Sequence, residues 1–430
     1  YTKTAGVDYA LLHTENTLCL RGGKWGSFND NAVHEVLRRS GVKQKALNGS
    51  REWFECDLAT AIKAIKAAKA GETSLHPSEV SHDQNPIVLR PEQKDAVART
   101  CKQLRKGNRM LWNAKMRFGK TLCALQVALE MNMQRTIIVT HRPVVDASWA
   151  DDFRKIFYKH PHWSYGSSLI GYRFDELRKK AEQGEHVVYF ASMQDMRGSK
   201  EVGGKFDKNN EVFAMPWDFV IVDEAHEGTQ TELGQAVIDQ LVGPNTKMLQ
   251  LSGTPFNLLD DYREEEVFTW DYVMEQRAKS DWDSLYPGDH NPYASLPAIH
   301  IYTYDLGRLR SEYGDEERAF NFREFFRTLD AGSFVHETDV RRFLDLLNDD
   351  RPDSLYPYAN DQFRSICRHT LLVLPGVKAA RELSALLCQH PVFSAFRVVN
   401  VSGEGDEEEE SRDALQSVNQ AIGPDPDETY

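Results

Sequence analysis

Residues 114–121, AKMRFGKT, constrain this chain of 430 residues more than any other stretch. The apolar run RMLWNA leads directly into them, and the helix-favouring stretch GKTLCALQVALEMN begins inside them. A loop of this composition between a buried strand and a helix offers backbone N–H groups and the positive end of the helix to a phosphate group. The pattern therefore predicts an α/β domain with a phosphate-binding loop at a strand–helix junction.

Each residue type in this loop suits the binding of ATP with Mg²⁺. Gly119 lets the backbone approach the phosphates, Lys120 reaches the β- and γ-phosphates, and Thr121 offers a hydroxyl to Mg²⁺. Ala114 opens the pattern, and we expect Arg117 to shape or flank the loop. The alternative, a chance Gly-Lys-Thr at the start of a helix, is disfavoured because both flanking elements are present.

A second group of polar residues, in VIVDEAHEG, follows the apolar strand expected at 219–222. Asp223 at a strand end is suited to hold Mg²⁺, directly or through water, and Glu224 to orient and deprotonate the water that attacks the γ-phosphate. His226 is placed to couple this turn to the neighbouring strand. On its own this could be a solvated turn, but after a phosphate-binding loop it indicates an ATPase.

Short apolar runs alternate with helical stretches from Pro91 onward, which predicts a parallel sheet covered by helices on both faces. The segment 266–360 contains helical stretches without short apolar runs between them. Two apolar runs at 369–376 and 396–403 then restart the alternation of strands and helices. We therefore expect five parts: a small α+β domain at 1–70, a linker at 71–86, an ATPase domain with a parallel sheet at 87–265, a helical and aromatic insertion at 266–362, and the beginning of a second α/β domain at 363–430. Because the chain starts at Tyr1 without Met and stops inside that second domain, we interpret it as part of a longer protein.

Composition narrows the class of protein less sharply. The formal net charge is -13, but residues 401–430 carry ten Asp or Glu against the single Arg412, so the rest is only mildly acidic and leaves a nucleic-acid partner open. The six cysteines form no CxxC pair, as expected in a reducing compartment. No apolar run approaches the roughly 20 residues of a membrane span, and no secretion signal is seen, so we expect a cytoplasmic protein without membrane contact.

The turn at 223–226, DEAH, together with SGTP at 252–255, resembles motifs II and III of superfamily 2 helicases and translocases, the DEAD/DEAH group. Further matches follow in the family's order: LRPEQ at 89–93, TIIVTHRPVV at 136–145 in the place of motif Ia, FASMQD at 190–195 as in restriction-type members, and HTLLVLPGVKAA at 369–380 in the place of motif IV. The resemblance covers about 90–260 and, more weakly, 365–420.

This resemblance implies an ATP-driven helicase or translocase, with Gln93 reading adenine. It also implies that the ATPase domain at 87–265 and the domain that begins at 363 are both RecA-like. It also implies residues that couple ATP to nucleic acid: Ser252, Thr254, His226, His141 and Arg142. DNA is favoured over RNA, and restriction-type motors work with nuclease or methyltransferase partner subunits. Motifs V and VI do not occur before Tyr430, and DEAH does not distinguish unwinding from translocation. An RNA helicase and a nucleotide-sensing DNA-binding scaffold with little turnover are the alternatives.

Residues 29–58 resemble the C-terminal half of small GIY-YIG nuclease domains of the phage-type subfamily. The resemblance implies a divalent-metal ligand at Asp30 or Glu35, next to His34, and a structural strand at 51–54. Neither GIY nor YIG is present, so a non-catalytic DNA-docking domain is the equal alternative.

Overall fold

The computed structural model describes residues 11–21, 24–47, 50–80, 87–206, 208–228, 232–296, 321–330, 332–348, 370–401 and 418. They belong to two compact units, which divide between Pro297 and Ala298. The acidic run at 404–410 lies outside the described residues, as do the end of the linker at 81–86 and Cys367. The other five cysteines have free thiols.

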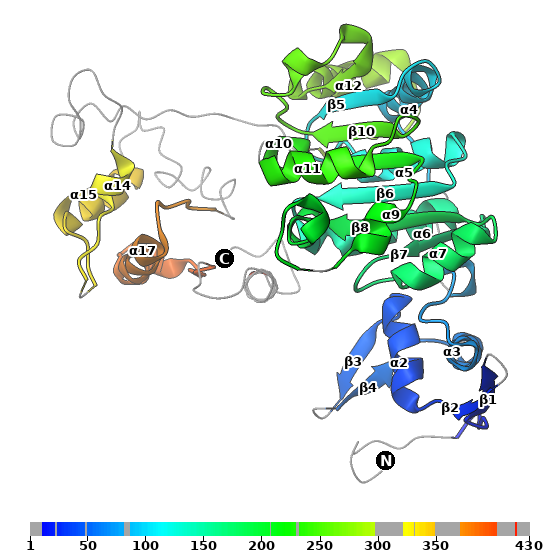
Figure 1. The fold of residues 1–430 in the computed structure, drawn as a ribbon. Coiled ribbons are helices and arrows are strands. Elements are labelled where there is room, and N and C mark those ends of the chain that lie inside the picture. Colours follow the sequence, from blue (N-terminus) through cyan, green and yellow to red (C-terminus); the bar gives the residue numbers. More distant parts are fainter. Residues whose placement is uncertain are drawn as a thin grey trace. The chain divides into compact units, whose positions relative to one another are not determined.

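A seven-stranded sheet forms the centre of the first unit, in the order β11-β5-β10-β9-β6-β8-β7 (Figure 1). Every pair of neighbouring strands is parallel, so all carboxyl ends meet at one edge. This confirms the α/β fold class and the parallel-sheet ATPase domain. The strands are β5 Arg109–Ala114, β6 Arg135–Thr140, β7 Trp163–Gly166, β8 His186–Ser192, β9 Phe219–Asp223, β10 Lys247–Ser252 and β11 Val267–Trp270.

Helices cover both faces of this sheet, and each face has its own core. Strand residues alternate between the two: Met110 and Trp112 of β5 pack with α4, α5 and α6, whereas Leu111 packs with α7, α8, α9 and α11. The helices are α4 Pro91–Leu104, α5 Lys120–Glu130, α6 Asp146–Phe157, α7 Phe174–Glu182, α8 Met193–Arg197, α9 Asn210–Ala214, α10 Ala225–Gly228, α11 Glu232–Leu241 and α12 Tyr272–Leu285. Short 3-10 turns are η1 Pro77–Glu79, η2 Pro143–Val145, η3 Lys200–Val202, η4 Leu259–Asp261 and η5 Glu264–Glu266.

Neither of the two edge strands, β7 and β11, was expected from the sequence. β11 pairs with β5 beyond the expected domain end at 265, in a segment for which no strand was predicted. Both β7 (WSYG) and β11 (VFTW) have four residues and a single neighbouring strand. Strands this short, with one partner each, lack the long apolar run of a central strand.

The N-terminal domain is the small α+β domain that was expected. Asn29 and Asp57 cap the two helices of this domain by accepting hydrogen bonds from backbone N–H groups, and Gly71 ends the second helix with φ of 85°. The helices pack on each other through Val36 and Ala64, which are buried in a common core. The elements are β1 Leu18–Arg21, β2 Lys24–Ser27, α2 Asp30–Arg39, β3 Gln44–Leu47, β4 Ser50–Phe54 and α3 Leu58–Ala70, with β1–β2 and β3–β4 antiparallel.

The described part of the second unit is helical. Its elements are α14 Phe322–Phe325, α15 Glu337–Leu347, α17 Val377–Gln389 and η6 Phe393–Ala395, which share a core that includes Val340 and Leu383. The strands predicted at 369–376 and 396–403 are wrong for residues 370–376 and 396–401, which pair with no strand. Leu371 and Val373 are 79% and 86% exposed there, and an apolar run becomes a strand only where a neighbour takes up its N–H and C=O groups. No helix in the described ranges of either unit has the length and apolarity to cross a bilayer.

Candidate nucleotide site

Three of the predicted motifs meet at the carboxyl edge of the sheet. Ala114 ends β5, Asp223 ends β9 and Ser252 ends β10, which lies between the other two strands. The register aligns Ser252 with Asn113 of β5. The structure thus brings the phosphate loop, the DEAH turn and the SGTP turn together.

The phosphate loop needs glycine at one position for two reasons. Gly119 caps α5 with φ of 90°, a conformation that L side chains rarely adopt. A Cβ at Gly119 would also come within 2.7 Å of Gln93 Nε2. Arg117, which is exposed, has φ of 66°, so the loop contains a second left-handed turn two residues earlier. The backbone thereby curves around the start of α5, the geometry that a bound phosphate requires.

Lys120 donates a hydrogen bond to the Ala114 carbonyl at 2.8 Å, so its ammonium lies beside the first residue of the loop. Burial lowers the pKa of Lys120, whereas Glu224 and Asp223 raise it. The SGTP turn is close as well, because a Cβ on Gly253 would lie 3.8 Å from Nζ. Among the described residues this ammonium has one hydrogen-bond acceptor, which it is suited to exchange for phosphate oxygens.

Gln93 is buried against the phosphate loop and is part of its support. Its Nε2 donates to the Phe118 carbonyl at 2.6 Å, and its Oε1 accepts the Arg90 backbone N–H at 2.8 Å. Arg90 also donates to Phe118 O, at 2.9 Å. An amide has two N–H donors and two acceptor lone pairs, so these bonds leave Gln93 capacity for a base. The reading of adenine by Gln93 stays a prediction.

The acidic turn after β9 carries two carboxylates in different settings. Asp223 accepts hydrogen bonds from Trp149 Nε1 at 3.3 Å and from the Glu224 backbone N–H at 3.0 Å. Burial, and then the neighbouring Glu224 charge, raise the pKa of Asp223. Glu224 has φ of 48°, and such strain in a residue other than glycine is typical of active sites. Trp149 carries no local sequence signal, since it precedes its partner by 74 residues.

His226 joins the acidic turn to the SGTP turn. Its Nδ1 lies 2.9 Å from Ser252 Oγ and 3.5 Å from Glu224 Oε2. Ser252 Oγ in turn accepts the Thr254 backbone N–H at 3.1 Å. A continuous path of hydrogen bonds therefore runs from the acidic turn into the turn after β10.

His141 and Arg142 follow β6 at the same edge. The register pairs Thr140 with Asp223, and Thr140 Oγ1 accepts the Arg142 backbone N–H at 3.2 Å. Arg142 is exposed, while His141 Nδ1 is buried without a hydrogen-bond partner in the part of the chain that the structure describes. These two residues thus border the acidic turn.

The structure does not bring the two nuclease candidates of the N-terminal domain together. Asp30 and Glu35 are five residues apart on α2, which rotates them by about 140° around the helix axis. Glu35 pairs with Arg173 at 2.5 Å, and Asp30 accepts the Asn31 backbone N–H at 2.9 Å. Within the described ranges, no three His, Cys, Asp or Glu side chains form a group that could hold a metal ion.

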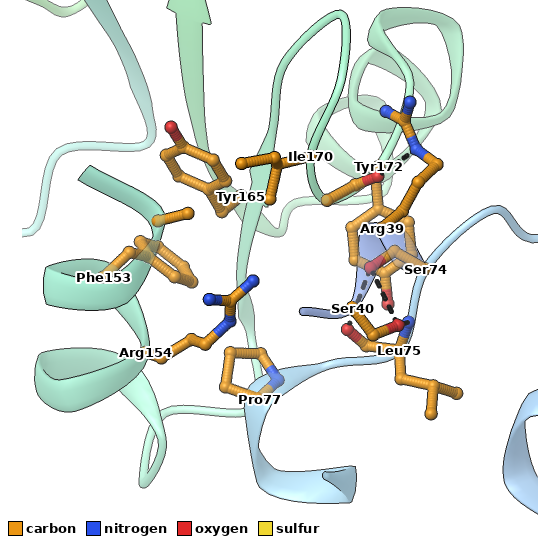
Figure 2. Close-up of a pocket in the computed structure, with 12 residues that line it drawn as sticks. Arg39, Ser40, Ser74, Leu75, Pro77, Phe153, Arg154, Tyr165, Ile170 and Tyr172 are labelled. Carbon is orange, nitrogen blue, oxygen red and sulfur yellow. Dashed lines mark hydrogen bonds between the residues drawn. The ribbon is translucent and has the colours of Figure 1, made fainter. Parts of the chain in front are cut away.

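A pocket lies between the N-terminal domain and the β7 edge of the sheet, away from the phosphate loop. Figure 2 shows Arg39 and Ser40 on one side and Phe153 and Arg154 on the other. Arg39 is buried, and its guanidinium donates to three carbonyls of the loop after β7, those of Ser167, Ser168 and Gly171. These bonds dock the N-terminal domain on the ATPase domain.

The donor set suits a nucleotide with a divalent cation. A glycine cradle, an ammonium, the Thr121 hydroxyl and the Asp223 carboxylate are the groups that bind phosphate and Mg²⁺ in ATPases. Glu224, the next residue along the chain, is the candidate base.

The chain is similar to a curated protein over about two thirds of its length. The chain is 25% identical over 362 residues to a Mycoplasma pneumoniae protein provisionally named a type II restriction enzyme and methyltransferase, C-terminus. The match covers 68% of the chain and 49% of that protein, so the chain spans about half the length of this curated relative.

Solved structures are similar to part of the chain. The Sulfolobus solfataricus SWI2/SNF2 ATPase core in complex with dsDNA is 18% identical, with 43% of this chain and 36% of that one covered and a TM-score of 0.32. The UvsW helicase of bacteriophage T4 is 19% identical, with 44% and 62% covered and a TM-score of 0.30. TM-scores this low establish no shared function. Residues 86–257 match the family described as "Type III restriction enzyme, res subunit".

Proposed function

We propose that this chain hydrolyses ATP to move along DNA, as a helicase or translocase coupled to restriction, repair or phage DNA processing. The observation that supports this best is the convergence of Lys120, Glu224 and Ser252 at one sheet edge, with His226 linking the last two. A site that only bound nucleotide would need neither the base nor the link.

In this proposal the residues divide the work. Lys120 leaves the Ala114 carbonyl for the β- and γ-phosphates, while the backbone N–H groups at the start of α5 hold their oxygens. Thr121 and Asp223 would hold Mg²⁺, which would supply positive charge beside the phosphates. Glu224 orients the attacking water and takes its proton.

The link between His226 and Ser252 passes the state of the nucleotide to the groups that grip nucleic acid. His226 Nδ1 reaches Glu224 as well as Ser252, so a shift of Glu224 on hydrolysis alters the hydrogen bonds of the SGTP turn. Thr254, His141 and Arg142 are the candidate backbone contacts. Such contacts to phosphates fix position without reading sequence.

DNA is the proposed track, because the curated relative is named a restriction enzyme and methyltransferase. Nuclease or methyltransferase subunits are the proposed partners, and the cytoplasm is the proposed location. For the N-terminal domain, metal-dependent cleavage at Asp30 or Glu35 is a hypothesis. The ion pair with Arg173 engages Glu35, one of the two candidate metal ligands, which favours the alternative of a non-catalytic DNA-docking domain.

The test is the rate of ATP hydrolysis by the full-length protein with single-stranded DNA, duplex DNA or RNA added in turn. We expect DNA to stimulate turnover, with the Glu224→Gln variant as the inactive control. Stimulation by RNA alone would select an RNA helicase. A rate that no polymer changes would select the nucleotide-sensing scaffold.

A further inference from the structure

The start of the phosphate loop is tied to the segment after the SGTP turn. The Lys115 backbone N–H donates to the Trp270 carbonyl at the end of β11, at 3.0 Å, and the Lys115 ammonium donates to Glu275 Oε1 of α12, at 2.6 Å. The Glu275 side chain is fully buried. Its second oxygen has no hydrogen-bond partner within the described residues. The buried carboxylate therefore depends on Lys115 to balance its charge.

The middle of the loop packs on the same segment. Phe118 is fully buried, with its ring centre 5.8 Å from that of Phe268 in β11 and 6.0 Å from that of Trp112 in β5. The Phe118 carbonyl is the acceptor that Gln93 and Arg90 share. One residue thus connects β11 to the segment before α4.

Tyr293, which follows α12, contacts the first turn of α4. Its hydroxyl donates to Glu92 Oε2 at 2.5 Å, and Glu92 Oε1 accepts from Arg90 Nε at 2.6 Å. The Tyr293 side chain is buried, and the Arg90 guanidinium lies 5.7 Å from the centre of its ring. A chain of contacts therefore runs from Tyr293 through Glu92 and Arg90 to the phosphate loop.

We propose that residues 267–293 support the phosphate loop of the nucleotide site, and that Glu275 and Tyr293 are positioning residues for this loop. The inference rests on the proposed ATP site at 114–121. A buried ion pair adds little net stability compared with apolar residues of the same size, and its best-attested use is to specify one arrangement. A loop held in its binding shape loses less freedom when phosphate binds, which raises affinity.

The chain offers a matched control at the other end of the same two strands. Arg109 begins β5, and its guanidinium pairs with Glu266, directly before β11, at 3.1 Å. The Glu266 side chain is 3% exposed, so this carboxylate is as buried as Glu275. This pair also joins β5 to β11, but at the sheet edge opposite the phosphate loop. The two pairs separate an effect on the nucleotide from an effect on stability.

The experiment compares two double variants of the full chain, each of which removes one pair without leaving a lone buried charge. For Lys115→Met with Glu275→Gln we expect the Kd of ADP and of a non-hydrolysable ATP analogue to rise about tenfold, within the range usual for coupling between distinct parts of a protein. The rate at saturating ATP should change little, which gives a split between KM and kcat. For Arg109→Met with Glu266→Gln we expect the parental Kd. Lys115→Arg keeps the ion pair and should also keep the parental affinity.

The inference is wrong if the Lys115/Glu275 double variant binds nucleotide like the parent, or if the control weakens binding equally. Should that double variant not fold, Tyr293→Phe decides, because it loses only one hydroxyl: a raised Kd supports the inference, and an unchanged Kd overturns it. Lys120→Ala distinguishes failure of the ATP site from failure of the further inference. Nucleotide binding that survives Lys120→Ala refutes the ATP site itself. Binding that is lost in Lys120→Ala but normal in the Lys115/Glu275 double variant refutes only the support of the loop by residues 267–293.

Discussion

His226 Nδ1 and Ser252 Oγ lie 2.9 Å apart and join the turns that end two neighbouring strands, β9 and β10. Ser252 is fully buried and also accepts the Thr254 backbone N–H, so the hydroxyl is fixed from both sides. In the proposed function, this hydrogen bond is the route by which a change at the nucleotide reaches the residues proposed to contact DNA.

Ser252→Ala removes this bond and leaves the phosphate loop intact. We expect ATP to bind with near-parental affinity, while stimulation of turnover by DNA falls by about fivefold or more, since the typical coupling between two sites is worth 5- to 150-fold. Turnover measured against DNA concentration checks this. Parental stimulation in Ser252→Ala would show that the bond does not transmit the signal.

Lys120→Ala removes the charge that faces the phosphates. Both ATP affinity and turnover should fall by about tenfold or more, because a charge-assisted hydrogen bond to phosphate contributes about 1.5–3 kcal/mol. Nucleotide titration together with steady-state hydrolysis measures both. A variant that hydrolyses ATP at the parental rate would contradict the assignment of the loop, and Lys115→Arg serves as a control that retains every charge.

Glu224→Gln keeps the shape of the acidic turn but removes the base. Turnover should drop by about 10²-fold or more, in the range expected for general base catalysis, while ATP binding persists. The variant should also hold DNA tightly in the ATP-bound state. Equilibrium binding and single-turnover hydrolysis test this, and a loss of ATP binding would instead make Glu224 a structural residue.

Asp146, the first residue of α6, is a buried carboxyl outside the nucleotide site. It accepts hydrogen bonds from Tyr165 Oη and Ser167 Oγ, each at 2.6 Å. Burial raises the pKa of Asp146, while those two bonds and the charges of Arg39 and Arg154 lower it in part.

A raised pKa in the folded state gives a stability contribution that is present below the ordinary Asp value and is lost as pH rises through the folded value. Asp146→Asn has no such titration. The Tm of the parent minus that of Asp146→Asn should therefore decrease from about pH 4 to about pH 8. Thermal unfolding over this range measures the difference, and an increase with pH would contradict the assigned direction.

The nuclease hypothesis predicts that the full-length protein cleaves DNA only with Mg²⁺ or Mn²⁺, because a metal must stabilise the leaving oxygen. Asp30→Asn with Glu35→Gln should abolish cleavage and leave ATP hydrolysis unchanged. The lost Glu35–Arg173 pair, which is partly exposed, should cost at most about 1 kcal/mol. Nicking that continues in this variant would leave DNA docking as the role of the domain.

The sequence predicted the centre of the fold well, because its signals there are local. The apolar runs of β5, β6, β8, β9 and β10 and the caps of α2 and α3 are all legible within a few residues. The site residues follow strands of one parallel sheet, and the carboxyl ends of parallel strands lie at the same edge. What the sequence missed lies in contacts between distant positions: Glu275 is 160 residues from Lys115, and Tyr293 is 201 residues from Glu92. The apolar run at 371–373 misled for the opposite reason, since a strand signal has no effect without a paired neighbour.

The docking of Arg39 has a consequence for solubility. Strand β7 is the last strand of its sheet, and its loop folds back so that the Tyr172 N–H donates to the Tyr165 carbonyl at 2.9 Å. Gly171 N–H then donates to the Arg39 carbonyl, also at 2.9 Å, so that the N-terminal domain seals the loop over the edge. An open sheet edge is a template for pairing between molecules. We therefore expect the N-terminal domain to limit edge-to-edge pairing between molecules, and an ATPase domain that begins at residue 87 to aggregate more readily.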